Sequence, residues 1–125
     1  MTQLEFPFPP RELNPNARVH WAKKAKVAKN YRATTYILCR KADIALPGTL
    51  GKLHLWIDFY PPDKRQRDAD NLLGAMKAGI DGLAEYYRIN DNRFIFHPWL
   101  KDEVIEGGCV KVRITTGPEC STTED

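Results

Sequence analysis

The sequence predicts a single α/β domain of the α+β kind, in which a small mixed or antiparallel sheet carries two principal helices. First, 125 residues are enough for one hydrophobic core and too few for two independent domains. Second, apolar residues recur at steps of three and four in residues 18–42 and 70–87, which is the period of amphipathic helices. Third, apolar and polar residues alternate in short segments around these two, as they do in strands.

The N-terminal part of the chain is expected to form a short strand at residues 2–8 and then a proline-rich loop as far as residue 16. The first helix follows at residues 18–42, and its polar faces are crowded with lysine and arginine. The face expected to pack on the core consists of Trp21, Ala25, Ala28, Tyr31, Thr35, Leu38 and Ala42.

A strand with one apolar face and a second helix are predicted next in the chain. Residues 52–60 alternate in polarity, and the less apolar face of this strand could be covered by a partner chain. Two prolines end the strand, and the second helix is predicted for residues 70–87 with Asp68 or Asp70 as its N-cap. The predicted core residues of these two elements are Leu53, Leu55, Ile57, Phe59, Leu72, Leu73, Met76, Ile80, Leu83 and Tyr87.

The C-terminal third is predicted to be mainly extended. A polar connection at residues 88–93 leads to an extended segment at residues 94–100. Residues 104–105 and 109–115 are expected to pair as a hairpin across a Gly-Gly turn, because glycine tolerates the positive φ angles of tight turns. The residues of the last strand expected to face the core are Val110, Val112 and Ile114.

The domain is predicted to span residues 1–116, and the polar residues 117–125 are expected to form a flexible tail. The hydrophobic and charged fractions, 42% and 28%, are ordinary for a folded protein and exclude wholesale disorder. Cys39, Cys109 and Cys120 are odd in number and lack metal-site spacing, so we expect a reducing cytosol and no disulfide framework. With neither a signal peptide nor a membrane-spanning run, no membrane association is expected.

Basic residues gather in two segments. The net charge of +3 is modest, but residues 23–41 of the first predicted helix carry seven lysines and arginines, and three more directly precede an acidic motif. Basic charge beside carboxylates is typical of a site that acts on a polyanion such as DNA. The residues expected to bind DNA are Arg18, Lys23, Lys24, Lys64, Arg65 and Arg67.

The acidic motif, Asp68-Ala69-Asp70, stands at the start of the second predicted helix. Side chains two residues apart in an extended segment point to the same side, so both carboxylates can reach one ion. Asp91 is the third candidate ligand, provided that the chain returns beside the start of the helix. Carboxylate oxygens suit Mg²⁺ and Mn²⁺, and such an ion can activate water and neutralise phosphate charge. The motif therefore predicts a metal-dependent site for phosphodiester cleavage.

Lys77 is a further candidate, because it lies seven residues after Asp70 and close to the same helix face. It could contact the scissile phosphate or stabilise a developing oxyanion. Taken one at a time, all four residues have simpler explanations: Asp68 and Asp70 can cap a helix, Asp91 can form a turn, and Lys77 can be a solvated surface lysine. Only their combination favours a catalytic site.

Together these motifs resemble the RusA family of Holliday junction resolvases. The similarity extends over most of residues 3–116 and includes the order of the predicted elements. The matching segments are Phe6-Pro-Phe-Pro-Pro10 with Asn14, Asn16 and Arg18; Lys64-Arg-Gln-Arg67; Asp68-Ala-Asp70-Asn71-Leu72; Lys77 with Ile80, Asp81 and Leu83; and Asn90-Asp91.

The resemblance implies that Asp68, Asp70 and Asp91 are metal-binding and catalytic, and that Lys77 is the catalytic lysine. Some members carry this lysine four residues after the second aspartate, where this chain has Gly74. The resemblance further implies a homodimer that binds four-way DNA junctions in DNA recombination and repair. Such an enzyme uses Mg²⁺, for which Mn²⁺ substitutes, and nicks two strands symmetrically in the cytoplasm of a bacterium or a phage-infected host cell.

Two other functions stay open. The chain could be a non-catalytic basic DNA-binding module whose carboxylates merely cap and solvate the second helix, with salt-sensitive affinity and no cleavage. It could also be a nucleotide-sugar transferase that uses the D-x-D motif. This last function is disfavoured, because the chain is too short for a doubly wound nucleotide domain and has no Gly-rich phosphate loop.

Overall fold

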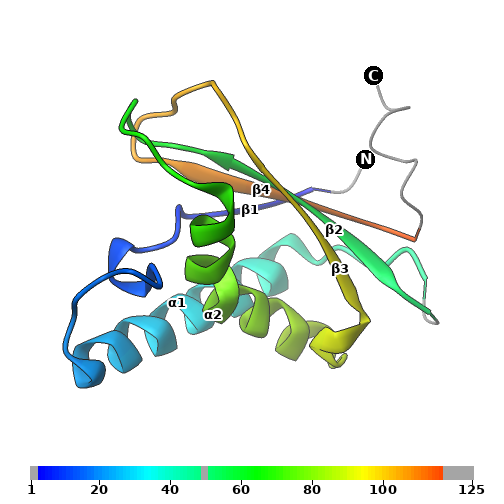
Figure 1. The fold of residues 1–125 in the computed structure, drawn as a ribbon. Coiled ribbons are helices and arrows are strands. Elements are labelled where there is room, and N and C mark those ends of the chain that lie inside the picture. The colour runs from blue at the N-terminus through cyan, green and yellow to red at the C-terminus, as the bar shows by residue number, and fades with distance from the viewer. Residues whose placement is uncertain (1–2, 49–50, 117–125) are drawn as a thin grey trace.

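Both helices lie on the same side of a four-stranded mixed sheet, which confirms the predicted α+β class (Figure 1). The computed structural model describes residues 3–48 and 51–116, so the predicted tail, residues 117–125, lies outside the described residues. Over the described ranges, neither helix is long and apolar enough to cross a membrane. The elements are β1 (Leu4–Phe6), η1 (Arg11–Leu13), α1 (Trp21–Ala42), β2 (Leu53–Tyr60), α2 (Ala69–Tyr87), η2 (Asp91–Arg93), β3 (Phe94–Leu100) and β4 (Cys109–Thr115).

The strand order, β1-β4-β2-β3, combines both kinds of pairing. β4 is antiparallel to β1 and to β2, whereas β2 and β3 run parallel. Parallel neighbours need a crossover connection, and α2 forms it between β2 and β3. In the resulting register, Ile57 of β2 lies between Val112 of β4 and Pro98 of β3. Proline is tolerated there because β3 is an edge strand.

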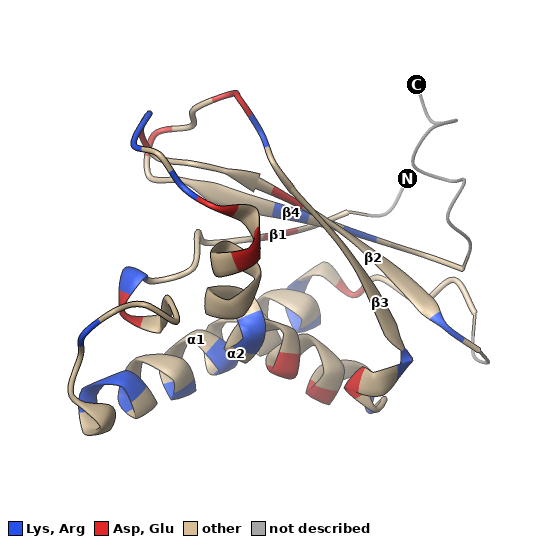
Figure 2. Cartoon of the chain, in the orientation of Figure 1, with Lys and Arg blue, Asp and Glu red and all other residues tan. Residues whose placement is uncertain are grey.

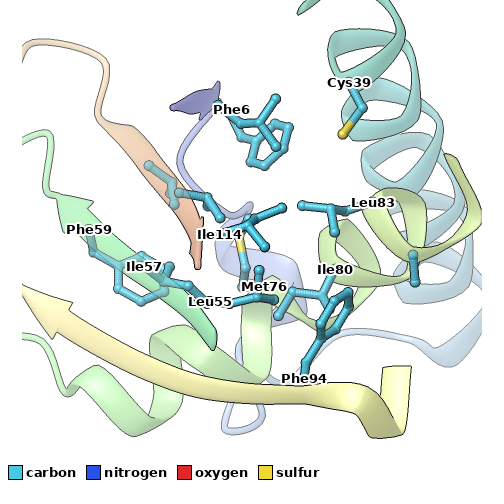
Figure 3. Packing of buried hydrophobic residues seen from close by; sticks show 14 of the residues in the cluster. Phe6, Cys39, Leu55, Ile57, Phe59, Met76, Ile80, Leu83, Phe94 and Ile114 are labelled. Atoms are coloured by element: carbon cyan, nitrogen blue, oxygen red, sulfur yellow. The ribbon is translucent and has the colours of Figure 1, made fainter. Parts of the chain in front are cut away.

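The hydrophobic core lies between the inner face of the sheet and the two helices (Figure 3). Alternation in β2 and β4 and helical periodicity in α2 place one side of each element in this core, as the sequence predicts. Burying each such side chain contributes about 1.5–3 kcal/mol. The buried residues that confirm the predicted faces are Leu53, Leu55, Ile57, Phe59, Leu72, Met76, Ile80, Leu83, Val110, Val112 and Ile114.

The two helices approach closely where α2 carries glycine. A Cβ atom at Gly82 would lie 2.2 Å from the Thr35 hydroxyl oxygen, and one at Gly79 would lie 2.7 Å from the Tyr31 ring. Thr35 is fully buried and donates a hydrogen bond to the Gly79 carbonyl oxygen at 2.8 Å. The Tyr31 hydroxyl donates to the Pro7 carbonyl oxygen at 2.6 Å. The proline loop and both helices are therefore joined at one place.

The first helix differs from its prediction at the N-terminus. α1 begins at Trp21, three residues late, because the extended backbone of His20 makes that residue the N-cap. Trp21, predicted to pack on the core, is 75% exposed, and Ala25 and Ala42 are exposed too. The first turns of α1 lie beside η1 and away from the sheet (Figure 1). Core contact is therefore made further along the helix, by Tyr31, Thr35 and Cys39.

The predicted hairpin between residues 104–105 and β4 is wrong. β4 lies between β1 and β2, so both of its edges are already paired. Residues 104–105 instead belong to a connection in which the Ile105 N–H donates to the Pro61 carbonyl oxygen at 3.0 Å. The glycine turn itself is confirmed, because Gly107 and Gly108 have φ angles of 82° and 74°.

Candidate functional site

Two carboxylates stand at the N-terminus of α2. Asp68 is the N-cap, since its extended backbone leaves the side-chain oxygen free to accept from the Asp70 N–H at 3.0 Å. Asp70 lies in the first turn, where the partial positive charge of a helix N-terminus stabilises a carboxylate. Both residues are exposed. The structure therefore brings these two predicted site residues together at the solvent surface.

Lys77 lies on an exposed side of α2 between two carboxylates. Its ammonium group donates to Asp91 Oδ2 at 2.9 Å and lies 3.6 Å from Asp81 Oδ1. The hydrogen bond to Asp91 is the main reason that the pKa of Lys77 is raised above its ordinary value. Lys77 is therefore a cation at neutral pH, suited to contact a phosphate and unsuited to act as a base.

Asp91 lies beside the middle of α2 and not beside its start, so the expected return of the chain is wrong. The 19 residues of α2 cover about 28 Å at the usual helical rise. Asp91 follows the last helical residue, Tyr87, by four residues, which can extend by at most about 14 Å. The Asp91 side chain can thus meet that of Lys77, which starts about 15 Å back along the helix axis, but cannot meet that of Asp70, about 25 Å back.

The aspartates consequently form two separate groups. Asp68 and Asp70 both stand at the start of α2, whereas Asp91 is paired with Lys77, about 10 Å further along the helix axis. Within the part of the chain that the structure describes, no three His, Cys, Asp or Glu side chains are placed to hold one metal ion. The three predicted ligands are therefore not brought together in this arrangement.

A cleft of about 750 Å³ lies between the proline loop, the segment after β2 and the start of α2. Asp68 lines it from α2, Arg65 and Arg67 line it from the preceding segment, and Arg11 lines it from η1. The cleft thus combines three guanidinium groups with one of the candidate carboxylates. Amide side chains that also line the cleft are those of Asn14, Asn16, Gln66 and Asn71.

Arg67 is fixed in the wall of this cleft. Its guanidinium group donates to the Asp63 carboxylate at 2.9 Å and to the Arg65 carbonyl oxygen at 3.0 Å, and it lies 5.5 Å from the centre of the Phe8 ring. The hydrogen bond from Arg67 lowers the pKa of Asp63. Only 15% of the Arg67 side chain is exposed. Arg67 therefore supplies a positive charge that is already oriented before any ligand binds.

A second hollow, of about 700 Å³, adjoins the first and shares Arg11, Asn14 and Asn16 with it. Arg18 and Lys23 line this second hollow, which therefore joins the cleft to the start of α1. Basic residues recur along the first turns of α1 (Figure 2). We call the five cations of the two hollows the basic surface: Arg11, Arg18, Lys23, Arg65 and Arg67.

The basic surface contains four of the six residues predicted to bind DNA. The other two, Lys24 and Lys64, line neither hollow; Lys24 is half-buried and Lys64 is exposed. Arg11 was missed by the sequence analysis, although it lies in both hollows. The signal for it was its place directly after Pro9 and Pro10, within the segment that carries the resemblance.

No family model matches the chain. A protein of Xylella fastidiosa strain Temecula1, described as an uncharacterized protein, is 42% identical over 118 residues, which cover 92% of this chain and 76% of that protein.

Proposed function

We propose that this chain, which belongs to the same family as the uncharacterized Xylella fastidiosa protein, is a magnesium-dependent endonuclease that acts on branched DNA. One observation carries the proposal: Asp68 lines the same cleft as Arg11, Arg65 and Arg67. Guanidinium groups bind phosphodiesters, and carboxylate oxygens bind hard divalent ions. A cleft that offers both can hold a DNA backbone next to candidate cleavage residues.

In this proposal Asp68 and Asp70 would hold the ion, because both are exposed and both stand at the start of α2. Mg²⁺ keeps several of its waters, so two protein carboxylates and a phosphate oxygen suit it. When bound, the ion would supply charge neutralisation at the phosphate and an activated water. The predicted third ligand, Asp91, fits a different role here, since it orients the Lys77 ammonium group.

The remaining groups have defined tasks. The basic surface binds successive phosphates and sets the direction of the strand across the start of α2. Lys77, held by Asp91 and Asp81, offers a cation further along α2, where it can neutralise a phosphate or a developing oxyanion.

We propose further that the working substrate is a four-way junction and that the enzyme is a homodimer, as the resemblance to the RusA family implies. A junction has two equivalent strands, and a two-fold dimer presents one site to each. Paired nicks would then resolve the junction in DNA recombination and repair. Sedimentation of the protein with and without a junction measures whether two chains bind one DNA molecule.

The test of the cleavage site is a comparison of wild-type protein with Asp70→Asn on a labelled four-way junction in the presence of Mg²⁺. We expect the wild type to nick the junction and the variant to bind it without cutting. Asp70→Asn leaves the Asp68 cap in place, because the Asp70 N–H is still present. Equal cutting by the two proteins would reject the assignment of this site.

A second candidate function is a DNA-binding module without catalysis. The observation that favours it is that Asp68 already caps α2 and Asp91 already pairs with Lys77. This function predicts salt-sensitive junction binding, with no cleavage by the wild type in either Mg²⁺ or Mn²⁺. The same labelled-junction experiment therefore distinguishes the two candidates.

A further inference from the structure

Trp21 is the most exposed large apolar side chain in the described part of the protein. It is 75% exposed at the first position of α1, whereas tryptophan side chains are on average highly buried. Burying an exposed indole ring against a partner would lower the free energy, because the apolar surface of the ring is removed from water. An exposed Trp on a rigid element therefore indicates a partner surface.

The indole ring is held in place by its neighbour. The His20 side chain accepts a hydrogen bond from the Ala22 N–H at 3.1 Å, which fixes the imidazole ring at the end of the helix. The His20 and Trp21 rings are stacked, with their centres 5.6 Å apart and an angle of 30° between their planes. Trp21 is therefore supported from one side and presented to solvent.

The charge around Trp21 indicates an anionic partner. The first turn of α1, all of which the structure describes, contains no acidic residue, and Lys23 and Lys24 lie close to its start. A helix N-terminus carries partial positive charge and is stabilised by acidic side chains, so lysines there are unfavourable in the free protein. A bound polyanion would remove this repulsion. Arg18 and Lys23 line the hollow that His20 also borders.

The combination of a fixed indole ring and adjacent cations fits nucleic acid better than an apolar partner. An apolar protein surface or a lipid tail would cover the indole but bring no negative charge to Arg18 and Lys23, whose hollow holds one carboxylate, Glu12, beside three cations. A nucleotide satisfies both groups, because its base has an aromatic face and its phosphate has negative charge. In a linear duplex the bases are stacked on one another. At a branch point or in a single strand, a base can stack on a protein side chain instead.

We propose that Trp21 stacks on an unstacked base at the branch point of the DNA, while Arg18 and Lys23 bind the flanking phosphates. This inference rests on the proposed function and specifies how the same surface recognises branched DNA. It assigns discrimination between branched and linear DNA to the N-terminal end of α1. The cleft at the start of α2 would then bind the DNA backbone for cleavage. The DNA backbone would reach this cleft from the second hollow by passing Arg11 and Asn14, which line both.

The chain contains a matched control. Trp99 is 64% exposed, so Trp99→Ala removes a similar exposed ring. It lies on β3 opposite Asp58 of β2 and lines neither hollow, and Lys101 lies over its ring at 5.7 Å. Both variants remove an exposed indole, and only one of them lies beside the second hollow.

The experiment measures binding to a four-way junction and to a linear duplex of the same sequence, in EDTA so that no cleavage occurs. We expect Trp21→Ala to weaken junction binding about 10- to 100-fold, the effect of losing one stacked base, and duplex binding less than about 2-fold. Trp21→Phe should restore most of the loss. Trp99→Ala should leave both affinities unchanged. Thermal unfolding of each variant checks that the fold is retained.

A fluorescent base gives a second readout. With 2-aminopurine at the branch point, the wild-type complex should be less fluorescent than the Trp21→Ala complex, because stacking on indole quenches the base. The inference is overturned if Trp21→Ala weakens junction and duplex binding equally, if Trp99→Ala has the same effect, or if junction binding does not change. If the wild type binds no DNA, the proposed function fails as well. Junction binding by the wild type with no effect of Trp21→Ala overturns the inference alone.

Discussion

Lys77 Nζ and Asp91 Oδ2 lie 2.9 Å apart, and this ion pair ties the η2 turn to the middle of α2. The lysine side chain is 59% exposed and the aspartate side chain is 39% exposed, so water screens the pair. The pair shows that the chain passes beside the middle of α2 after leaving it. It also keeps a cation and a carboxylate in a fixed relation next to the proposed DNA surface.

Breaking this pair should affect cleavage far more than stability. Exposed ion pairs contribute at most about 1 kcal/mol, so Asp91→Asn and Lys77→Met should each change the free energy of unfolding by less than that. We expect each to lower junction cleavage more than 10-fold, since the ammonium group is lost or no longer oriented. Urea unfolding and single-turnover cleavage measure the two effects. Asp81→Asn is the control, because it keeps the shorter contact of Lys77; an equal loss with this variant contradicts the prediction.

Asp68 has a structural and a proposed catalytic role, and two substitutions separate them. Asn is as good an N-cap as Asp, so Asp68→Asn should keep the melting temperature but lose cleavage. Asp68→Ala should lose cleavage and also about 1 kcal/mol of stability. Calorimetry and the labelled-junction assay test this. Wild-type cleavage rates with Asp68→Asn would mean that capping is the only role of this residue.

Two glycines of α2 should differ in how much stability is lost when each is replaced by alanine. In Gly82→Ala the new Cβ would meet the Arg32 backbone carbonyl oxygen at 2.3 Å, and backbone cannot move aside easily. We expect a loss of about 1–3 kcal/mol, despite the better helix propensity of Ala. Gly74→Ala meets only the Pro15 ring of an exposed loop residue, and should stay within about 1 kcal/mol of the wild type. Similar losses at both sites in urea unfolding would contradict this account.

Stability should rise with pH through the titration of His97. Burial, with a smaller effect from the nearby His54 ring, lowers the pKa of His97. The unfolded chain then binds a proton more readily than the folded protein, so acidification below the unfolded value of about 6.5 favours unfolding. The free energy of unfolding should therefore increase from about pH 5 to about pH 7, and less steeply in His97→Gln. Urea titrations at several pH values measure both slopes, and equal slopes would show that His97 contributes nothing.

Arg11 should contribute one phosphate contact. It lines both hollows, so Arg11→Gln is expected to weaken DNA binding and to lower the dependence of log affinity on log salt concentration by about 1. Arg40→Gln, an exposed arginine in the last turn of α1, serves as the control and should change neither quantity. Fluorescence anisotropy at several salt concentrations gives the slope. A slope that is the same in Arg11→Gln and the wild type would exclude this contact.

The sequence predicted the elements whose signal is local. The alternation of β2 and the periodicity of α2 each repeat over many residues, and both elements have their expected core faces. The hairpin failed because pairing of β4 depends on β1, which lies about 100 residues earlier in the chain and leaves no sign in residues 104–115. The prediction that Trp21 packs on the core was wrong for a similar reason, because helical periodicity does not show where a helix extends past its sheet.

The candidate site was predicted in part. Adjacency of Asp68 and Asp70 follows from their spacing, and a helix start with a capping aspartate was expected. The pairing of Asp91 with Lys77 and the cleft around Arg11 depend on the length of the connections and on the path of the proline loop. Those are properties of the whole fold, which no single motif encodes.

The Tyr31 hydroxyl and the Thr35 hydroxyl join the proline loop, α1 and α2 through neutral groups. Dissolved ions weaken attraction between charges but leave such buried hydrogen bonds almost unaffected. Rising ionic strength should therefore weaken the proposed binding of DNA to the basic surface while the fold is retained. The proposed DNA contacts depend on attraction between charges, whereas the contacts between the proline loop and the two helices are neutral hydrogen bonds. If the proposed DNA binding is correct, salt should therefore reverse it without unfolding the protein.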